Sequence, residues 1–190
     1  MKTFDGRFYV CENTNVKYVE PDDGITTNFK MFNKRIFLAG PITGAPNWQV
    51  DMACELIKLN QNDLHSTLIC NPRRKTYGDS FDFGYQVHWD QIHLQNCNIV
   101  LFYIPPATDT NIGDGYAKTT MYELAEMVHT SKYRPDVRII IVMYPEHPMF
   151  EYVKERILNM ENIDKKNIVF LNGGSFGLEY LKKIAKIVME

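Results

Sequence analysis

The segment that decides the fold is Asn98-Ile99-Val100-Leu101-Phe102-Tyr103-Ile104. It lacks the alternation of polar and apolar residues that marks a strand with one face in water. An unbroken apolar run of this length predicts a parallel strand that is covered on both faces. Pro105 ends the run, and the residues from there to Lys118 predict a long loop of the kind that often forms a lid or a binding loop.

On both sides of this segment, apolar runs alternate with stretches of helical periodicity. Strands are expected at residues 35–39, 66–70, 98–104, 137–143 and 167–171, and helices at residues 47–60, 86–96, 120–132, 146–160 and 178–188. Five strands in this rhythm predict an α/β fold with a five-stranded parallel, doubly wound sheet of the flavodoxin or Rossmann-like type and right-handed crossovers.

The N-terminal residues do not follow this rhythm. Arg7–Cys11 and Val16–Val19 are typical of strands, and the turn-rich residues 12–15 lie between them, so a β-hairpin is expected. Pro21–Gly24 then breaks the pattern. We therefore expect two parts, an N-terminal β-hairpin appendage over residues 1–33 and an α/β domain over residues 34–190.

Composition narrows the class of protein. The chain has 190 residues, of which 45% are apolar, which is enough for a hydrophobic core and excludes global disorder. Its 21 Lys and Arg residues against 23 Asp and Glu residues argue against a nucleic-acid polymer as partner, because such binding needs a basic surface. The balance suits a small-molecule ligand instead.

Targeting and cysteine patterns predict a cytoplasmic protein. No apolar run is long enough to span a membrane, and residues 1–13 lack the apolar centre of a signal peptide. The four cysteines are widely spaced, with no Cys-x-x-Cys motif and no Cys/His cluster. We expect no metal site, no cofactor and no disulfide framework, and free thiols in a reducing compartment.

Ligands of doubly wound sheets bind at the carboxyl ends of the strands, so the turns there carry the candidate chemistry. The first is Ala39-Gly40-Pro41-Ile42-Thr43-Gly44, which is neither a P-loop nor a Gly-x-Gly-x-x-Gly motif. Its glycines would let backbone N–H groups approach a ligand at a helix N-terminus. A plain tight turn between strand and helix explains the same residues equally well.

Two carboxylates follow in neighbouring strand–helix units. Asp90 is expected in the first turn of its helix, where interaction with the helix dipole is a sufficient explanation. Thr120-x-x-Glu123 fits a capping box, and it also fits a carboxylate held at the ligand edge of the sheet. As a pair, Asp90 and Glu123 suggest glycoside-type chemistry, in which one carboxylate attacks the anomeric carbon and the other transfers a proton.

At four places the chain resembles the nucleoside 2-deoxyribosyltransferase superfamily, which includes nucleotide N-glycoside hydrolases. The segments are Ile36–Ile42, Asn71-Pro72-Arg73-Arg74, Trp89-Asp90 followed by Cys97–Leu101, and Thr120-x-x-Glu123-Leu124-Ala125. Together they span residues 35–145. Three departures from the pattern are Phe37 in place of a Tyr, Ala125 in place of a Gly, and a longer loop over residues 106–118, which leaves Asp109 and Asp114 unaligned.

The resemblance implies a role for each matching residue. Glu123 would be the nucleophile at C1′ of a 2′-deoxynucleoside, and Asp90 would contact the base or sugar and transfer a proton. The implied substrate-binding residues are Gly40, Pro41, Ile42, Pro72, Arg73, Trp89, Thr119 and Thr120. Members of the superfamily are homo-oligomers whose sites are completed by a neighbour, a role that residues 172–175 would take here.

Three functions stay open at this point. The first is transfer of the deoxyribosyl group between bases. The second is hydrolysis of a nucleoside 5′-monophosphate, with Arg73, Arg74 and Lys75 supplying cations for the phosphate and Thr119 and Thr120 supplying hydroxyls. The third is a non-catalytic protein that binds or sequesters a nucleotide.

Overall fold

The computed structural model describes residues 2–4, 7–9, 15–60, 66–74, 81–108, 113, 115–161, 163–173 and 176–190, with residues 2–4 and 7–9 described by their backbone alone. The chain forms two compact units. The first comprises residues 1–37, 47–97 and 177–190, and the second comprises residues 38–46 and 98–176.

The first unit is built on three parallel strands in the order β3–β5–β4. Their bounds are β3 Val16–Val19, β5 Thr67–Cys70 and β4 Lys34–Ala39. Thr67 of β5 lies opposite Val16 on one side and Lys34 on the other, so all three strands run in the same direction. The strand β5 is buried along its whole length, and it confirms the strand expected over residues 66–70.

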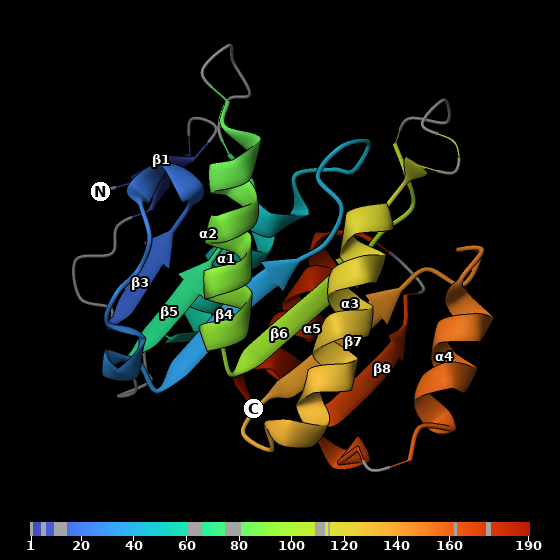
Figure 1. Cartoon of the computed structure of the whole chain (residues 1–190). Coiled ribbons are helices and arrows are strands. Elements are labelled where there is room, and N and C mark those ends of the chain that lie inside the picture. Colours follow the sequence, from blue (N-terminus) through green and yellow to red (C-terminus); the bar gives the residue numbers. More distant parts are fainter. Residues whose placement is uncertain are drawn as a thin grey trace. The chain divides into compact units, whose positions relative to one another are not determined.

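Three long helices cover these strands on both faces. They are α1 Trp48–Asn60, α2 Phe83–Asn96 and α5 Leu178–Met189. Figure 1 shows α2 on one face and α1 and α5 on the other. The helices expected over residues 47–60 and 178–188 are confirmed. Apolar residues recur in α1 at a spacing of three to four, and of these Trp48, Met52 and Leu56 are buried, whereas Leu59 is exposed.

The second unit repeats the plan with parallel strands in the order β6–β7–β8. Their bounds are β6 Ile99–Ile104, β7 Arg138–Met143 and β8 Ile168–Asn172. All six residues of β6 are buried, which confirms the prediction from its unbroken apolar sequence. The helix α3, Lys118–Thr130, lies across β6 and β7, and α4, Phe150–Leu158, lies beside β8 (Figure 1). The helix α4 is shorter than the expected 146–160, because it begins only after Pro148.

Short 3-10 helices complete the described structure: η1 Pro21–Asp23, η2 Phe29–Met31, η4 Ser131–Tyr133 and η5 Lys165–Asn167. Within the described residues, no helix is both long and apolar enough to cross a membrane.

The parallel strands and the helices that flank them confirm the predicted α/β class with a doubly wound, Rossmann-like arrangement.

The number of strands and the N-terminal hairpin need correction. Six strands run in parallel rather than five, because Val16–Val19 forms β3 and pairs with β5. Among the described residues of the predicted partner strand, Arg7–Tyr9 pairs with Lys2–Phe4 instead. The antiparallel pair at the N-terminus joins β1, Lys2–Phe4, to β2, Arg7–Tyr9. Residues 12–14 of the turn predicted at residues 12–15 lie outside the described residues. The domain boundary after residue 33 stays a prediction.

Candidate functional site

Asp90 occupies the middle of α2 rather than its first turn. The helix begins at Phe83, where the side chain of Asp82 caps it by accepting a hydrogen bond from Tyr85 N at 3.0 Å. The field of the helix dipole fades beyond the first turn, so it does not explain a carboxylate at this position. Asp90 is half-buried, and its position needs another explanation.

That explanation begins with the side chain of Gln86, one turn earlier on α2. Its Nε2 donates to Asp90 Oδ1 at 2.8 Å and to the carbonyl oxygen of Pro72 at 3.1 Å. Its Oε1 accepts from Arg74 Nε at 2.6 Å. Gln86 thus joins Asp90 to the segment that follows β5, and brings two predicted site residues, Asp90 and Pro72, into one hydrogen-bonded group.

The surroundings of Asp90 raise its pKa from the usual 3.8 to about 7. Burial is the largest cause, because it disfavours the charged form. The hydrogen bond from Gln86 and the positive charge of Arg74 act in the opposite direction and lower the pKa. Near neutral pH, Asp90 is therefore present in both protonation states, as a general acid and base must be.

Arg74 is held in place by several contacts. Its Nη1 forms an ion pair with Asp22 Oδ1 at 2.9 Å. The centre of its guanidinium group lies 5.4 Å from the ring centroid of Phe81 and 5.5 Å from that of Tyr85, which are distances typical of cation–π contacts. The charge of Arg74 therefore already has a protein partner.

The predicted residues Pro72 and Arg73 follow β5 directly. Pro72 is buried and Arg73 is half-buried. The backbone N–H of Arg73 donates to Asn71 Oδ1 at 2.9 Å, and Asn71 Nδ2 donates in turn to the hydroxyl of Tyr18 at 2.6 Å. A fully buried Asn71 thus shapes this turn. Lys75, which was expected to add a cation, lies outside the described residues.

Trp89 packs in the core of the first unit. It is fully buried, and its indole N–H donates to the carbonyl oxygen of Gly24 at 2.9 Å. Its ring stacks on His93 with centroids 3.8 Å apart. The backbone N–H of Thr26 donates to His93 Nε2, so Nδ1 carries the ring proton and donates to Trp89 O. Burial lowers the pKa of His93, which favours this neutral form.

The glycine-rich turn lies in the second unit. Gly40 and Pro41 are buried, and Ile42 is half-buried. Gly44 has a φ of +70°, a left-handed conformation that glycine adopts without strain. Its carbonyl oxygen accepts from both the N–H of Thr108, at 2.8 Å, and the hydroxyl of Thr108, at 3.1 Å. These bonds connect the turn after β4 to the loop after β6.

Glu123 lies in the second turn of α3 and is half-buried. The expected capping box of Thr120 and Glu123 is wrong, because the helix begins at Lys118 and its N-cap is Ala117, with a φ of +58°. Thr120 is the third helical residue and is buried, while Thr119 is exposed. With the capping explanation removed, the alternative of a carboxylate presented to a ligand gains weight.

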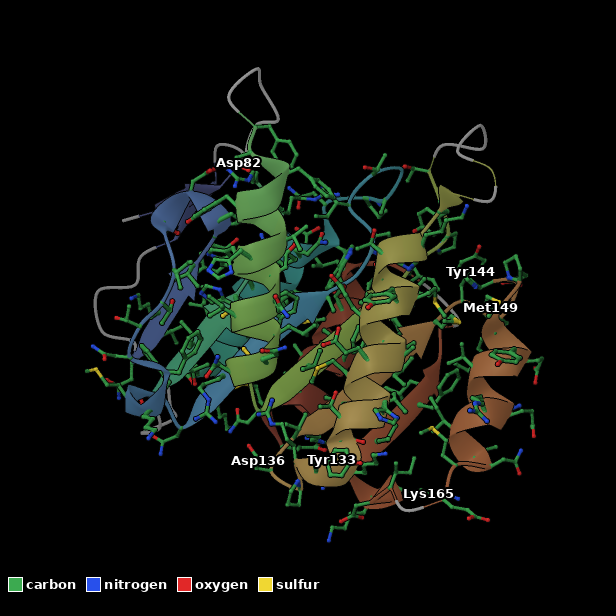
Figure 2. The ribbon with its side chains drawn as sticks, viewed as in Figure 1. Asp82, Tyr133, Asp136, Tyr144, Met149 and Lys165 are labelled. Atoms are coloured by element: carbon green, nitrogen blue, oxygen red, sulfur yellow. The ribbon has the colours of Figure 1, made fainter. Side chains whose placement is uncertain are left out.

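An aromatic cluster lies at the carboxyl ends of the strands in the second unit. The ring of Phe176 meets Tyr103 at 5.3 Å and Tyr144 at 6.5 Å between centroids. Figure 2 shows Tyr144 directly after β7. The hydroxyl of Tyr116 donates to the carbonyl oxygen of Pro105 at 2.6 Å and thereby ties the two ends of the long loop. Burial and the nearby Tyr144 raise the pKa of Tyr116, so its phenol stays neutral.

Sequence patterns did not single out this aromatic cluster as a site, although Tyr144–Pro148 follows a predicted strand. The contacts of Gln86 and Arg74 were missed as well, because they join residues that are far apart in the sequence. Asn172, proposed to serve a neighbour's site, is exposed, whereas residues 174 and 175 lie outside the described part of the chain. The same holds for Asp109 and Asp114.

Within the described residues, no three His, Cys, Asp or Glu side chains are grouped so that they could hold a metal ion. The described cysteines Cys54, Cys70 and Cys97 carry buried thiols, and the Sγ of Cys97 lies 3.8 Å from that of Cys70.

Comparison with known proteins adds a family assignment. The family model described as nucleoside 2-deoxyribosyltransferase like matches residues 33–138, which is more than half of the chain. The matched range includes both Asp90 and Glu123. A comparison with curated proteins found no match.

Proposed function

Because the chain belongs to the nucleoside 2-deoxyribosyltransferase-like family, we propose that it cleaves the N-glycosidic bond of a 2′-deoxynucleoside and transfers the deoxyribosyl group to another nucleobase. The family indicates an enzyme of this type with a small-molecule nucleoside as partner. The observation that carries the finer proposal is Asp90, a half-buried carboxyl group with a pKa of about 7 that Gln86 holds in one direction.

Glu123 is the nucleophile in this proposal. Its carboxylate attacks C1′ while the bond from C1′ to the base nitrogen breaks and its electron pair leaves with the base. A covalent deoxyribosyl-enzyme results. A second base then attacks C1′ from the face that the first base left, and the electron pair of the ester bond returns to Glu123. Two inversions give net retention, as in retaining glycoside hydrolysis.

Asp90 is the proton-transfer group. In its neutral form it gives a proton to the leaving base, which makes that base a better leaving group. Its carboxylate then takes a proton from the incoming base and completes the cycle. A pKa of about 7 suits both directions, because neither protonation state is scarce near neutral pH.

We assign binding roles to the remaining predicted residues as part of the same proposal. Gly40, Pro41 and Ile42 line the sugar or base pocket, and the left-handed Gly44 and its bonds to Thr108 hold this turn in shape. Pro72 and Arg73 border the substrate beside Asp90. Trp89, fully buried, acts by supporting the backbone of α2 next to Asp90.

Hydrolysis of a nucleoside 5′-monophosphate is the second candidate. Thr119 supports it, because its hydroxyl is exposed in the first turn of α3, where backbone N–H groups favour an anion. Arg74 gives this candidate little support, because Asp22 already pairs with its charge. Of the two described cations in the Arg73–Lys75 run, Arg73 is therefore the one that would bind the phosphate.

Incubation with defined substrates separates these functions. The purified protein is mixed with deoxyinosine and adenine, and separately with dCMP or dGMP alone, and the bases and nucleosides are separated by chromatography. Formation of deoxyadenosine with release of hypoxanthine supports transfer. Release of free base from a monophosphate alone supports the hydrolase. Tight binding of a nucleotide without release of any base would reject both and favour a binding protein.

A further inference from the structure

We propose that Gln86 is a positioning residue that fixes the orientation of the Asp90 carboxyl group and so decides which of its two oxygens carries the transferable proton. This inference rests on the proposed function, in which Asp90 moves a proton to and from a base. The geometry that carries it lies within the first unit and joins three segments: α2, the turn after β5, and η1.

The orientation of the Gln86 amide is determined by its partners. Arg74 Nε can only donate a hydrogen bond, so the atom 2.6 Å away must be the oxygen of Gln86. The carbonyl oxygen of Pro72 can only accept, so the atom 3.1 Å away must be the nitrogen. Both donors and one lone pair of the amide are in use, and a flipped amide would lose the bonds to Arg74 and Pro72.

The partners of Gln86 are themselves fixed. Asp22 and the rings of Phe81 and Tyr85 hold the guanidinium group of Arg74. The hydroxyl of Tyr85 also donates to the carbonyl oxygen of Pro21, which connects the start of α2 to η1. Asp82, visible at the start of α2 in Figure 2, caps the helix there. The contacts of Arg74 and of the start of α2 therefore hold the Gln86 amide in place, and the amide in turn holds Asp90.

The hydrogen bond from Gln86 makes the two carboxyl oxygens of Asp90 different. Gln86 Nε2 donates to Oδ1, so Oδ1 acts as an acceptor in both protonation states. The acidic proton of neutral Asp90 then resides on Oδ2, and the carboxyl group presents a donor on one side alone. A base that receives this proton must approach from the Oδ2 side, which restricts the orientation of the leaving base.

The charges around Asp90 are consistent with this arrangement. Arg74, from the turn after β5, is the cation whose charge acts on Asp90, and Asp22 of η1 partly balances it. His93 lies one turn further along α2, but its ring is bonded to Thr26 and Trp89 and is neutral. The loss of the Gln86 donor would therefore leave carboxylate Asp90 less stabilised and raise its pKa.

Two variants test the role of Gln86 in the full-length protein. Gln86→Met removes all three hydrogen bonds at similar volume, and Gln86→Glu keeps an acceptor for Arg74 but removes both donors. Gln95→Met is the matched control, because Gln95 is an exposed residue on the same helix. The titration of the Asp90 carboxyl carbon is followed by NMR in each protein, and the pH profile of kcat/KM for base exchange is measured in parallel.

The expected result is a rise of the Asp90 pKa by about one unit or more in both Gln86 variants, with kcat reduced about 10-fold or more and KM little changed. Gln95→Met should match the wild type in both measurements. An unchanged Asp90 titration in folded Gln86→Met and Gln86→Glu would overturn the proposal. The titration needs no turnover, so it remains decisive even if the wild-type protein exchanges no base, an outcome that would reject only the proposed function.

Discussion

Thr108 donates two hydrogen bonds to a single acceptor, the carbonyl oxygen of Gly44, through its backbone N–H at 2.8 Å and its hydroxyl at 3.1 Å. The loop after β6 is thereby connected to the glycine-rich turn after β4. Thr108→Val keeps the backbone bond and removes the other. We expect KM for the nucleoside to rise a few-fold, with a loss of stability of at most about 1 kcal/mol, because the hydroxyl bond is exposed.

Steady-state kinetics and urea unfolding measure these two effects. Thr130→Val is the control, because the hydroxyl of Thr130 bonds to Glu126 O within α3 and its removal should leave KM unchanged. Equal KM values for the wild type and Thr108→Val would show that the hydroxyl is dispensable for the shape of the turn.

Replacement of the proposed nucleophile should stop turnover. Glu123→Gln keeps the shape of the side chain and removes its charge, so base exchange should fall by about 1,000-fold or more, since the covalent step loses its attacking group. Chromatography of the bases measures the rate, and circular dichroism confirms the fold. Glu126→Gln, one turn further along α3 and exposed, is the matched control and should retain full activity. Normal exchange by Glu123→Gln would refute the assignment.

The raised pKa of Asp90 predicts how stability depends on pH. A carboxyl group with a folded-state pKa of about 7 and an unfolded value near 3.8 favours the folded state in its protonated form. That contribution is complete below about pH 4 and is lost as the pH rises through about 7. Between pH 4 and pH 8 the wild type should therefore lose up to about 4 kcal/mol relative to Asp90→Asn.

Urea unfolding of both proteins at pH 4 and pH 8 measures this difference. His93 changes stability in the opposite direction, because its lowered pKa makes its contribution fall as the pH drops below about 6.5. Both proteins contain His93, so its effect cancels in the comparison. Parallel stability curves for the wild type and Asp90→Asn would contradict a raised pKa.

Replacement of the buried Gln49 should give a variant more stable than the wild type. It lies in the first turn of α1 and is fully buried, and neither its Oε1 nor its Nε2 has a hydrogen-bond partner among the residues that the structure describes. An unbonded buried amide costs about 1–3 kcal/mol. Gln49→Met should recover part of this cost and raise the free energy of unfolding by about 1 kcal/mol. A loss of stability would show that the amide is bonded in solution.

A substitution at Gly173, directly after β8, tests how tightly the aromatic cluster around Phe176 is packed. A Cβ at this position would lie 2.2 Å from the ring of Phe176, so that ring must move away from Tyr103 and Tyr144 in Gly173→Ala. We expect a loss of about 1–3 kcal/mol, typical of overpacking. Gly115→Ala is the control, because a Cβ there would meet nothing within 4 Å. Equal melting temperatures for the two variants would mean that Phe176 has room to move without cost.

The parts of the fold that were predicted correctly are those with a strong local signal. The strand β6 is apolar at every position, and α5 alternates between buried Leu181, Ile184 and Val188 and exposed polar residues. The expected hairpin is wrong for β3, because a four-residue strand-like segment after a turn looks the same whether its partner is the previous strand or β5. Pairing between distant segments leaves no trace in local periodicity.

The site was predicted less completely, for a similar reason. Asp90 and Glu123 are recognisable as carboxylates in neighbouring strand–helix units, but their surroundings depend on tertiary contacts. Gln86 is an ordinary polar helix residue until Arg74 and Pro72 are brought to it by the fold. The N-cap of α3 is Ala117 in a left-handed conformation, a choice that no sequence rule favours, since alanine lacks a capping side chain.

The segment after β3 determines where the chain can be truncated without loss of contacts. The family match begins at residue 33, yet Gly24 and Thr26 supply the backbone partners of Trp89 and His93, and β3 covers one side of β5. A chain trimmed at residue 33 would remove the partners of the Trp89 indole N–H and of His93 Nε2, and it would turn β5 into an open sheet edge, a known route to aggregation. The range that the family model matches is thus shorter than the part of the chain that completes the sheet edge at β5 and the contacts of Trp89 and His93.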